Sequence, residues 1–415
     1  MSTGKLAAFA AVPEHANWEQ LIARPNPLYS RDDDIRSPFA RDYTRILHSM
    51  AYRRLKHKTQ VFFNIDNDHI CTRMEHVSHV ESVSSTIASE LGLNAELTKA
   101  ISIGHDLGHA PFGHQGEAVI QEITKKYLGK DFWHEQNGLR FVDKIELLKD
   151  NYDMRQNLNL TYAVRDGILS HCGEVDLNGL KPRDISITLD DFDSSGKYES
   201  VTWEGCVVKM ADKIAYVGRD IEDAVSLGLL SETDKSELQK MARIHDQRAV
   251  NTTVIMHNMI IDICQNSSPD EGIRLSRDLN DQLKEIKDFN YSHIYNNKRL
   301  KPYIHYSELV IHQLFEALKD LYAGKYTFNA LEANQRFAPT LFPSFANWLA
   351  KYCEIEIVPD GELKRASLNC ENEKIYSRLE TEEIYIQAIV DYISGMTDRF
   401  AITLFNELLQ FGVGN

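Results

Sequence analysis

The chain has 415 residues, of which 43% are hydrophobic and 26% are charged, which is typical of a soluble globular protein. Lys and Arg number 46 against 61 Asp and Glu, so the formal net charge is −15. That charge excludes a protein that coats nucleic acid through bulk positive potential, although a local basic pocket for a phosphate-bearing small molecule stays compatible with it.

The ends and the cysteines bear on the cellular setting. The weakly apolar N-terminus stops at Pro13, and we interpret it as a frayed arm, with a signal peptide as the alternative. No window approaches the roughly 18 apolar residues that a membrane span needs. The six cysteines are scattered without a CxxC pair, which favours reduced thiols and a cytoplasmic protein.

Apolar residues recur at intervals of three and four along most of the chain, which is typical of amphipathic helices. The pattern predicts helices over 39–55, 74–91, 95–107, 116–128, 137–149, 206–228, 243–265 and 382–411. Strand-like sequence is confined to 59–64 and to two candidate hairpins, 184–202 and 353–368, the first of which also reads as a loop. We therefore expect an all-α fold with a C-terminal helical extension and one or two short β-hairpins.

Residues 104–117 read GHDLGHAPFGHQGE and carry the densest group of reactive side chains in the chain. Histidine and carboxylate groups bind transition metals and transfer protons near neutral pH. His105 and His109 are four residues apart, so they share a helix face if the helix continues to Pro111. The mixture indicates a metal site or a catalytic site.

A metal site needs ligands from further segments of the chain. His76 is the upstream candidate, on an amphipathic helix. Asp212 is the downstream candidate because it lies among apolar and small residues, where a buried acid needs a partner. That partner is a metal ion or, as the alternative, a buried arginine.

The order His, His-Asp, Asp resembles the ligand pattern of the HD-domain phosphohydrolases. Five blocks resemble, in order, the dGTPase branch of deoxynucleoside triphosphate triphosphohydrolases: 36–62, 72–76, 104–117, 211–223 and 391–401. The resemblance runs from about Arg31 to the C-terminus. It implies an N-terminal arm over 1–30, an HD-domain catalytic core over 31–240, and a helical region over 241–415 that completes the active site and makes oligomer contacts.

Position by position, the resemblance implies a role for individual residues. It implies that the metal ligands are His76, His105, Asp106 and Asp212. It assigns catalysis to His114, Glu117, His109 and His134, with His114 as the general acid and His109 beside the α-phosphate. It assigns substrate binding to Gln60, Arg73, Lys213, Tyr216 and Asp220. Of these, Arg73 and Lys213 would bind the phosphates, and the other three would bind the deoxyribose.

The implied reaction is hydrolysis of a dNTP, dGTP among the substrates, to the deoxynucleoside and inorganic triphosphate. A metal-bound water would attack the α-phosphorus, and the ligand set is compatible with Mn, Mg, Fe, Co, Ni or Zn. The resemblance further implies a homo-oligomer, with a hexamer favoured, and regulation by nucleotides or single-stranded DNA at separate sites.

Other interpretations remain open at this point. The chain has no GxxxxGK[ST] segment, which counts against a P-loop NTPase. A different HD phosphohydrolase, acting on a monophosphate, a cyclic phosphodiester or an alarmone, is the second candidate, and a non-catalytic nucleotide sensor is the third. Glu117 also suits the first turn of a helix, and Lys58 suits a solvated helix face. His171 is open between a structural and a phosphate-binding role, and Tyr291, Tyr295, Lys298 and Arg299 are unaligned triphosphate candidates.

Overall fold

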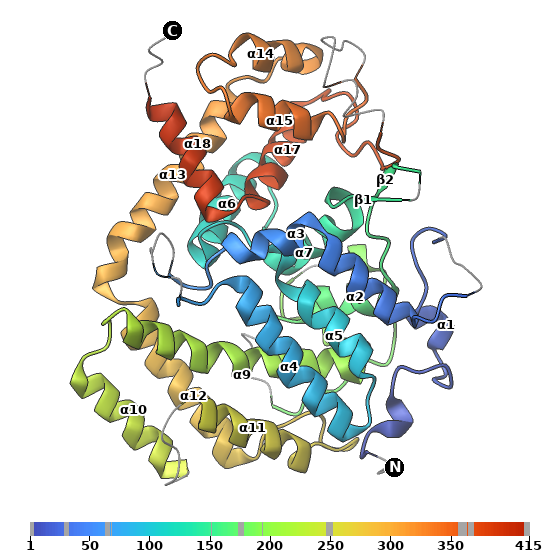
Figure 1. Ribbon diagram of the computed structural model, residues 1–415, viewed down its shortest axis with the longest axis vertical. Helices are drawn as coiled ribbons and strands as arrows, with labels where there is room; N and C mark the ends of the chain where they lie inside the picture. Colours follow the sequence, from blue (N-terminus) through green and yellow to red (C-terminus); the bar gives the residue numbers. More distant parts are fainter. Residues whose placement is uncertain are drawn as a thin grey trace. The chain divides into compact units, whose positions relative to one another are not determined.

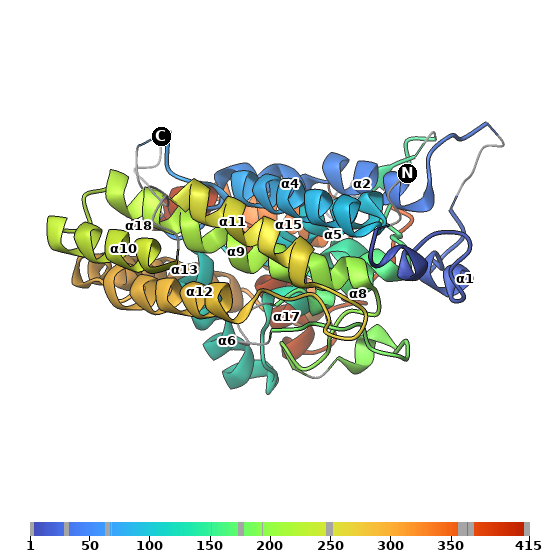
Figure 2. The same ribbon diagram turned by 90° about the horizontal axis from the view of Figure 1, so that it is seen from below.

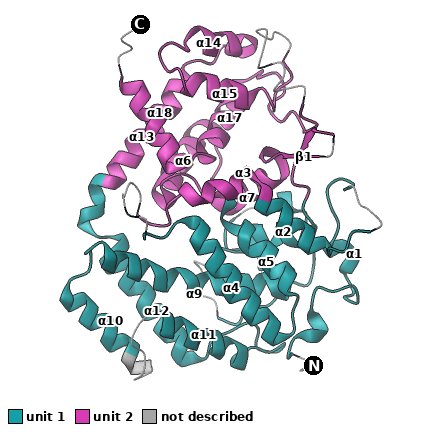
Figure 3. Ribbon diagram, viewed as in Figure 1, with its two compact units in different colours: residues 1–47, 65–107, 160–302 teal, residues 48–64, 108–159, 303–415 magenta. Residues whose placement is uncertain are grey.

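The computed structural model describes residues 4–28, 33–62, 67, 69–150, 152–172, 178–192, 194–245, 252–355, 363 and 369–410. The chain forms two compact units (Figure 3). Unit 1 comprises residues 1–47, 65–107 and 160–302, and unit 2 comprises residues 48–64, 108–159 and 303–415. Within the described ranges, no helix is both long and apolar enough to span a membrane.

Unit 1 is helical. Figures 1 and 2 show α4 running beside α9, and α4 also packs on α5, which in turn contacts α8 and α9. The inward faces of these helices bury Val80, Ile101 and Val207 completely, as their periodic spacing predicts. The α-helices that lie in unit 1 are α1 (Trp18–Leu21), α2 (Pro38–His48), α4 (Arg73–Leu91), α5 (Ala95–Gly104), α8 (Tyr162–Ser170), α9 (Trp203–Ser226), α10 (Glu232–His245), α11 (Thr252–Asn266) and α12 (Arg277–Phe289). Short turns of helix complete it: η1 (Ala7–Phe9), η3 (His105–Gly108), η5 (Leu189–Asp191), the π-helix η6 (Asn290–Tyr295) and η7 (Lys298–Leu300).

The N-terminal segment of unit 1 is packed, so the expectation of a frayed arm is wrong for residues 4–28. Leu6, Ala11 and Leu21 are at most 1% exposed. The buried carboxylate of Glu204 accepts hydrogen bonds from the backbone N–H groups of Ala11 and Asn94, both at 2.9 Å. The segment is held by burial and by this carboxylate, and neither feature shows in a local hydrophobic pattern.

Unit 2 is also mainly helical. Its helix α6 packs against α17, and α15 packs against α14 and α17. The elements are α3 (Met50–Arg54), η2 (Leu55–His57), α6 (Gly113–Leu128), α7 (His134–Arg140), the π-helix η4 (Phe141–Ile145), β1 (Leu148–Lys149), β2 (Arg155–Gln156), α13 (Lys301–Lys319, which begins in unit 1), η8 (Gly324–Tyr326), α14 (Thr327–Ala333), α15 (Leu341–Leu349), α17 (Glu382–Ser394) and α18 (Asp398–Leu409).

The all-α class is confirmed, but the strands lie elsewhere than predicted. In the described residues, one antiparallel pair, β1 with β2, is the whole sheet. The described residues of 184–202 form a loop with one 3₁₀ turn, and the described part of 59–64 contains no strand. Most of 353–368 lies outside the described residues. The hairpin at 148–156 has two-residue strands, too short to leave an alternating pattern.

The helices predicted over 74–91, 116–128 and 206–228 are confirmed within three residues. Three long predictions are interrupted instead. The 39–55 run breaks at Ser49, whose side chain caps α3 by accepting from the N–H of Tyr52. The 137–149 run ends at residue 145, and the 382–411 run breaks between α17 and α18. The helix predicted over 243–265 is divided: residues 243–245 belong to the end of α10, residues 252–265 belong to α11, and residues 246–251 lie outside the described residues.

Candidate metal centre and histidine cluster

The first turn of α4 carries two of the predicted site residues of unit 1. Thr72 and Glu75 form a capping box, in which the Thr72 hydroxyl accepts from the N–H of Glu75 and the Glu75 carboxylate accepts from the N–H of Thr72. This reciprocal cap fixes where the helix begins. It thereby sets the positions of Arg73 and His76, which are 1% and 4% exposed.

His105 follows the last turn of α5 and is fully buried. Its Nδ1 lies 2.6 Å from the carbonyl oxygen of Ser102, so Nδ1–H donates and the lone pair falls on Nε2. Nε2 finds no hydrogen-bond partner among the described residues. An imidazole held through Nδ1 with a buried, unpartnered Nε2 has the arrangement of a metal ligand with its outer hydrogen bond.

Three further side chains approach this Nε2 atom. Asp106 Oδ1 lies 3.3 Å away and Asp212 Oδ1, on α9, lies 3.7 Å away. Asp212 Oδ1 is also 2.9 Å from Nε2 of His76. The structure thus brings together all four residues predicted as metal ligands. Ligand atoms of His76, His105 and Asp212 lie within 4.8 Å of one another, and this nitrogen and oxygen set suits a divalent transition ion.

His171, which the sequence left open, belongs to the same centre. Ligand atoms of His105, Asp106 and His171 also lie within 4.8 Å of one another. The rings of His105 and His171 meet edge to face at 4.9 Å, and Nδ1 of His171 lies 2.6 Å from the carbonyl oxygen of Ile168. In each histidine, Nδ1 therefore hydrogen-bonds the backbone carbonyl three residues before it. The sequence signal for His171 was that, like His105, it directly follows a buried helix.

The electrostatics of the centre reflect its two carboxylates. Burial by itself lowers the pKa of His105, but the charges of Asp106 and Asp212 outweigh burial and raise this pKa to about 9. Burial likewise opposes ionisation of Asp212, yet the neighbouring imidazoles of His105 and His76 hold the pKa of its carboxyl well below the usual value. Without a metal, a proton on His105 balances the carboxylates, and a metal ion would replace that proton.

Two buried cations accompany the centre. The guanidinium of Arg73 donates from Nη1 to Asp106 Oδ2 at 2.9 Å, whereas its Nε and Nη2 find no partner among the described residues. Lys213, on α9, is 4% exposed. Buried donors without acceptors are costly, so Arg73 keeps two N–H groups that an anion would satisfy.

The predicted deoxyribose contacts of unit 1 lie further along α9. The hydroxyl of Tyr295, in η6, donates to the buried carboxylate of Asp220, and Tyr216 lies half-buried one turn before Asp220. Nearby, Asn290 donates to the carbonyl of Val217 at 3.0 Å. The π-helix η6 thus meets α9 through two hydrogen bonds, and such distortions are frequent at functional sites. Of the unaligned candidates, Tyr291 packs edge to face on Tyr295 and Arg299 donates to the carbonyl of Gly228.

Unit 2 holds a separate cluster centred on the carboxylate of Glu117. His109 Nδ1 hydrogen-bonds Glu117 Oε1 directly, whereas the ring nitrogens of His134 and His114 lie 3.4 Å and 3.6 Å from Oε2. The His109 and His134 rings stack at 3.9 Å. Glu117 therefore binds His109 more closely than His114, the partner that the sequence suggested. Burial would raise the pKa of Glu117, but His109 and His134 hold it well below its usual value.

Exposure separates the three histidines of this cluster. The side chain of His114 is 63% exposed, whereas those of His134 and His109 are 14% and 4% exposed. His114 is thus the member best placed to exchange a proton with a ligand. Gln60, also in unit 2, has a buried side-chain oxygen without a hydrogen-bond partner among the described residues, which suits a residue that awaits a ligand.

Two residues of unit 2 with a part in the site were missed or misread. Lys58 is 2% exposed, so the prediction of a solvated face is wrong for it; its ammonium donates to backbone carbonyls, including that of Ser394 at 3.0 Å. Asp398 is 5% exposed and accepts from the N–H of Phe112 at 2.9 Å. The sequence signal for Asp398 was its place in the 391–401 block, to which no role had been assigned.

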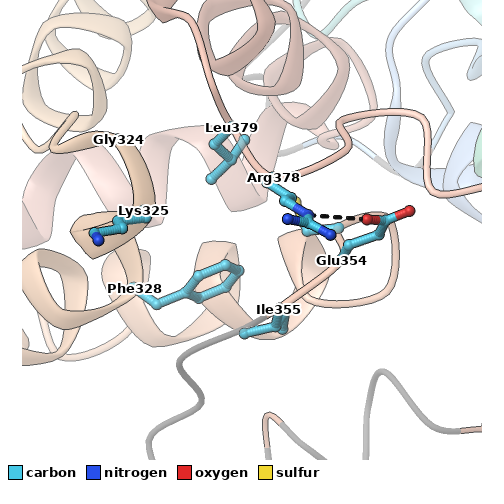
Figure 4. A pocket seen from close by; sticks show the side chains of 8 residues that line it. Gly324, Lys325, Phe328, Glu354, Ile355, Arg378 and Leu379 are labelled. Atoms are coloured by element: carbon cyan, nitrogen blue, oxygen red, sulfur yellow. Dashed lines mark hydrogen bonds and ion pairs between the residues drawn. The ribbon is translucent and has the colours of Figure 1, made fainter.

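A hollow elsewhere in unit 2 does not compete with these clusters. Figure 4 shows Lys325, Phe328 and Leu379 around it, with Arg378 paired to Glu354 at 3.2 Å. Its lining combines this compensated ion pair with apolar side chains. It contains none of the predicted site residues.

Comparison with known proteins agrees with the clusters. Residues 73–217 match the HD domain, and residues 368–407 match the phosphohydrolase-associated domain. A deoxyguanosinetriphosphate triphosphohydrolase-like protein of Clostridium tetani is 32% identical over 399 residues, covering 96% of this chain and 92% of the relative. Relatives with the same name from Caldanaerobacter subterraneus and Rickettsia bellii are 31% and 28% identical, covering 90% and 92% of this chain and 86% and 94% of their own.

Proposed function

Since the chain belongs to the deoxyguanosinetriphosphate triphosphohydrolase-like family of HD-domain hydrolases, we propose that it hydrolyses dNTPs, dGTP among them, to the deoxynucleoside and inorganic triphosphate. The single observation that carries this proposal is the buried centre of unit 1. There, His76, His105, Asp106 and Asp212 converge, and Nε2 of His105 has no hydrogen-bond partner among the described residues.

These four residues would hold a divalent metal ion, whose identity among Mn, Mg, Fe, Co, Ni and Zn stays open. When bound, such an ion would supply a water molecule of lowered pKa and would polarise a phosphoryl oxygen of the α-phosphate. Asp106 is the ligand that also binds Arg73, at 2.9 Å. We infer that this ion pair orients the carboxylate toward the ion and the guanidinium toward the substrate.

The cations of unit 1 would bind the triphosphate. Arg73 has two buried N–H groups without acceptors among the described residues, and phosphate oxygens would satisfy both in the bidentate geometry that guanidinium favours. Lys213 would add a second positive charge. Because phosphoryl transfer depends mainly on positioning and on charge stabilisation, these cations offset the acidity of the protein where the substrate binds.

The cluster of unit 2 would supply the proton that the reaction needs. The family resemblance of residues 104–117 assigns His109, His114 and Glu117 to the same reaction as Asp106. The 5′-oxygen leaves poorly as an alkoxide, and a proton from Nε2 of His114 would neutralise it. Glu117, 3.6 Å from Nδ1 of His114, would orient that imidazole, with His109 beside the α-phosphate and His134 as a further active-site histidine.

The family resemblance assigns recognition of the deoxyribose to three residues. Gln60 and Asp220 would hydrogen-bond the 3′-hydroxyl, and Tyr216 would pack on the sugar ring. The buried, unpartnered oxygen of Gln60 supports this assignment, because a site built around a hydroxyl discriminates strongly against a substrate that lacks it. We further propose a homo-oligomer, with a hexamer favoured, and control by a nucleotide or single-stranded DNA.

Analysis of the products tests this proposal. The purified protein is incubated with each dNTP and each candidate divalent ion, and nucleosides and polyphosphates are separated by chromatography. Equal amounts of deoxynucleoside and inorganic triphosphate are expected. Release of orthophosphate or pyrophosphate would instead support the second candidate, a different HD phosphohydrolase.

A further inference from the structure

We propose that Asp398 is a positioning residue, whose carboxylate fixes the catalytic loop 109–113 and the neighbouring Thr59–Gln60 segment relative to each other. The inference rests on the proposed function for the roles of Gln60 and of the histidine cluster. Every contact that carries it lies within unit 2.

The carboxylate of Asp398 serves two segments at once. Its Oδ1 accepts from the backbone N–H of Phe112 at 2.9 Å. Its Oδ2 accepts from the backbone N–H and the hydroxyl of Thr59, at 3.1 and 2.7 Å. Asp398 begins α18 and is 5% exposed. A buried carboxylate with three short donors from two segments is a rigid link, because losing either segment leaves charge or donors unsatisfied.

The loop end of this link is a backbone that needs support. Phe112 has φ 65° and ψ 20°, and Gly113 follows with φ 60°. The left-handed region is unfavourable for a residue with a bulky side chain, and such geometry persists only where surrounding contacts impose it. The hydrogen bond from Phe112 to Asp398 is one of those contacts. The turn directs the chain into α6, whose first turns carry His114 and Glu117.

Lys58 forms a second link beside the first. Its buried ammonium donates to the carbonyl of His109 and, at 3.0 Å, to that of Ser394 at the end of α17. The α17–α18 junction therefore contacts the loop directly at Phe112, through Asp398, and is linked to His109 through Lys58. Ser394 and Asp398 both lie in the segment that matches the phosphohydrolase-associated domain. The geometry thus gives this C-terminal segment a task in catalysis, which is to hold the loop.

The other end of the link reaches the sugar contact. Thr59 precedes Gln60, whose buried side-chain oxygen awaits a partner. One carboxylate therefore positions both the residue assigned to the 3′-hydroxyl and the loop that carries His109. Weakening it should reduce the rate and, at the same time, the discrimination in favour of substrates with a 3′-hydroxyl.

The test compares Asp398→Asn with Glu146→Gln in the full-length protein. Glu146 is the matched control because it is also buried in unit 2, but it accepts the backbone N–H of Ala51 at 2.9 Å and pairs with Arg54 instead of bonding residues 109–113. For Asp398→Asn, kcat for dGTP should fall by about 10- to 100-fold, as expected for small misplacement of catalytic groups. The kcat/KM ratio of dGTP to 2′,3′-dideoxy-GTP should fall about fivefold or more, since the hydrogen bond to the 3′-hydroxyl is weakened.

Hydrogen exchange provides a readout that does not need activity. Backbone amides of residues 58–60, 110, 112 and 113 should exchange faster in Asp398→Asn than in the wild type, whereas Mn²⁺ affinity should be retained. Thr59→Val, which removes one of the three donors, should change the same quantities in the same direction and serves if Asp398→Asn does not fold. Unchanged exchange in these segments overturns the inference. So does an equal loss of kcat in Glu146→Gln, or a retained preference for the 3′-hydroxyl. An inactive wild type would refute the proposed function instead. The exchange data would then still test whether Asp398 holds the two segments in place.

Discussion

At the scale of single residues, the proton on His105 is the most direct consequence of the metal centre. Asp106 and Asp212 overcome the effect of burial and raise the pKa of His105 to about 9 in the metal-free protein. Its imidazole is therefore charged at neutral pH, and a divalent ion must displace that proton to reach Nε2. Metal binding at pH 7.5 should release a proton from His105, and the release should vanish as the pH rises through about 9.

The measurement is titration calorimetry with Mn²⁺ in buffers of different ionisation enthalpy, repeated across this pH range.

The raised pKa of His105 also makes the stability of the metal-free protein depend on pH. Because the folded pKa lies above the unfolded one, protonated His105 stabilises the metal-free protein below pH about 6.5, and this contribution is lost as the pH rises toward 9. A proton release that does not depend on pH would contradict the assignment of His105 as a ligand.

His114 carries the second prediction at this scale. Its side chain is 63% exposed and lies 3.6 Å from Glu117, so it can deliver a proton without contributing to the core. His114→Ala should reduce kcat by about 100-fold or more, the contribution of a general acid. Its melting temperature and Mn²⁺ affinity should stay at wild-type values.

The control for His114 is His305→Ala. His305 is a 78% exposed histidine that pairs with Glu308 away from the cluster, and its replacement should leave kcat unchanged. Steady-state kinetics and a Mn²⁺ titration on each variant decide the matter. Wild-type turnover by His114→Ala would remove the general-acid role from this residue.

At the scale of elements, the close approach of Gly108 to α7, both in unit 2, holds His134. A Cβ on Gly108 would lie 2.0 Å from the carbonyl oxygen of His134 and 2.2 Å from the N–H nitrogen of Gly138. Asn137 also donates to the carbonyl of Gly108 at 2.7 Å. Gly108→Ala should therefore displace α7, costing about 1–3 kcal/mol of unfolding free energy as an overpacked contact does, and should lower kcat.

Gly129→Ala provides the comparison for this backbone contact. Gly129 ends α6 with φ 63°, and a Cβ there would meet nothing within 4 Å. Its cost should be about 1 kcal/mol of left-handed strain, without a loss of kcat. Denaturant unfolding and kinetics on both variants separate the two effects, and equal kcat values would show that the Gly108–α7 contact does not matter for catalysis.

Sequence periodicity predicted the helices but not the contacts that place the site. The helices α4 and α9 were predictable because their apolar residues recur over five or more turns. The breaks at Ser49 and between α17 and α18 were not, since a cap or a short turn changes few residues. Residues 74–76, 104–117 and 211–216 marked the candidate site because metal-binding chemistry restricts residue type. Lys58 and Asp398 were out of reach because their partners are backbone atoms distant in sequence.

At the scale of the whole molecule, the division into a core over 31–240 and a helical region over 241–415 stays a prediction. The compact units are built differently, because each gathers segments from three parts of the chain. Sequence order alone does not reveal such interleaving. For the assembly, light scattering on the purified protein should give a particle of six chains of 47.5 kDa each. A monomer at working concentration would exclude the proposed hexamer while leaving the chemistry untouched.

The origin of the oxygen atom in the products tests the central claim most directly. Hydrolysis of dGTP in ¹⁸O-enriched water with Mn²⁺, followed by mass spectrometry, shows which bond breaks. Attack at the α-phosphorus predicts unlabelled deoxyguanosine and inorganic triphosphate that carries one ¹⁸O atom. Labelled deoxyguanosine, or release of orthophosphate or pyrophosphate in place of triphosphate, would contradict the account.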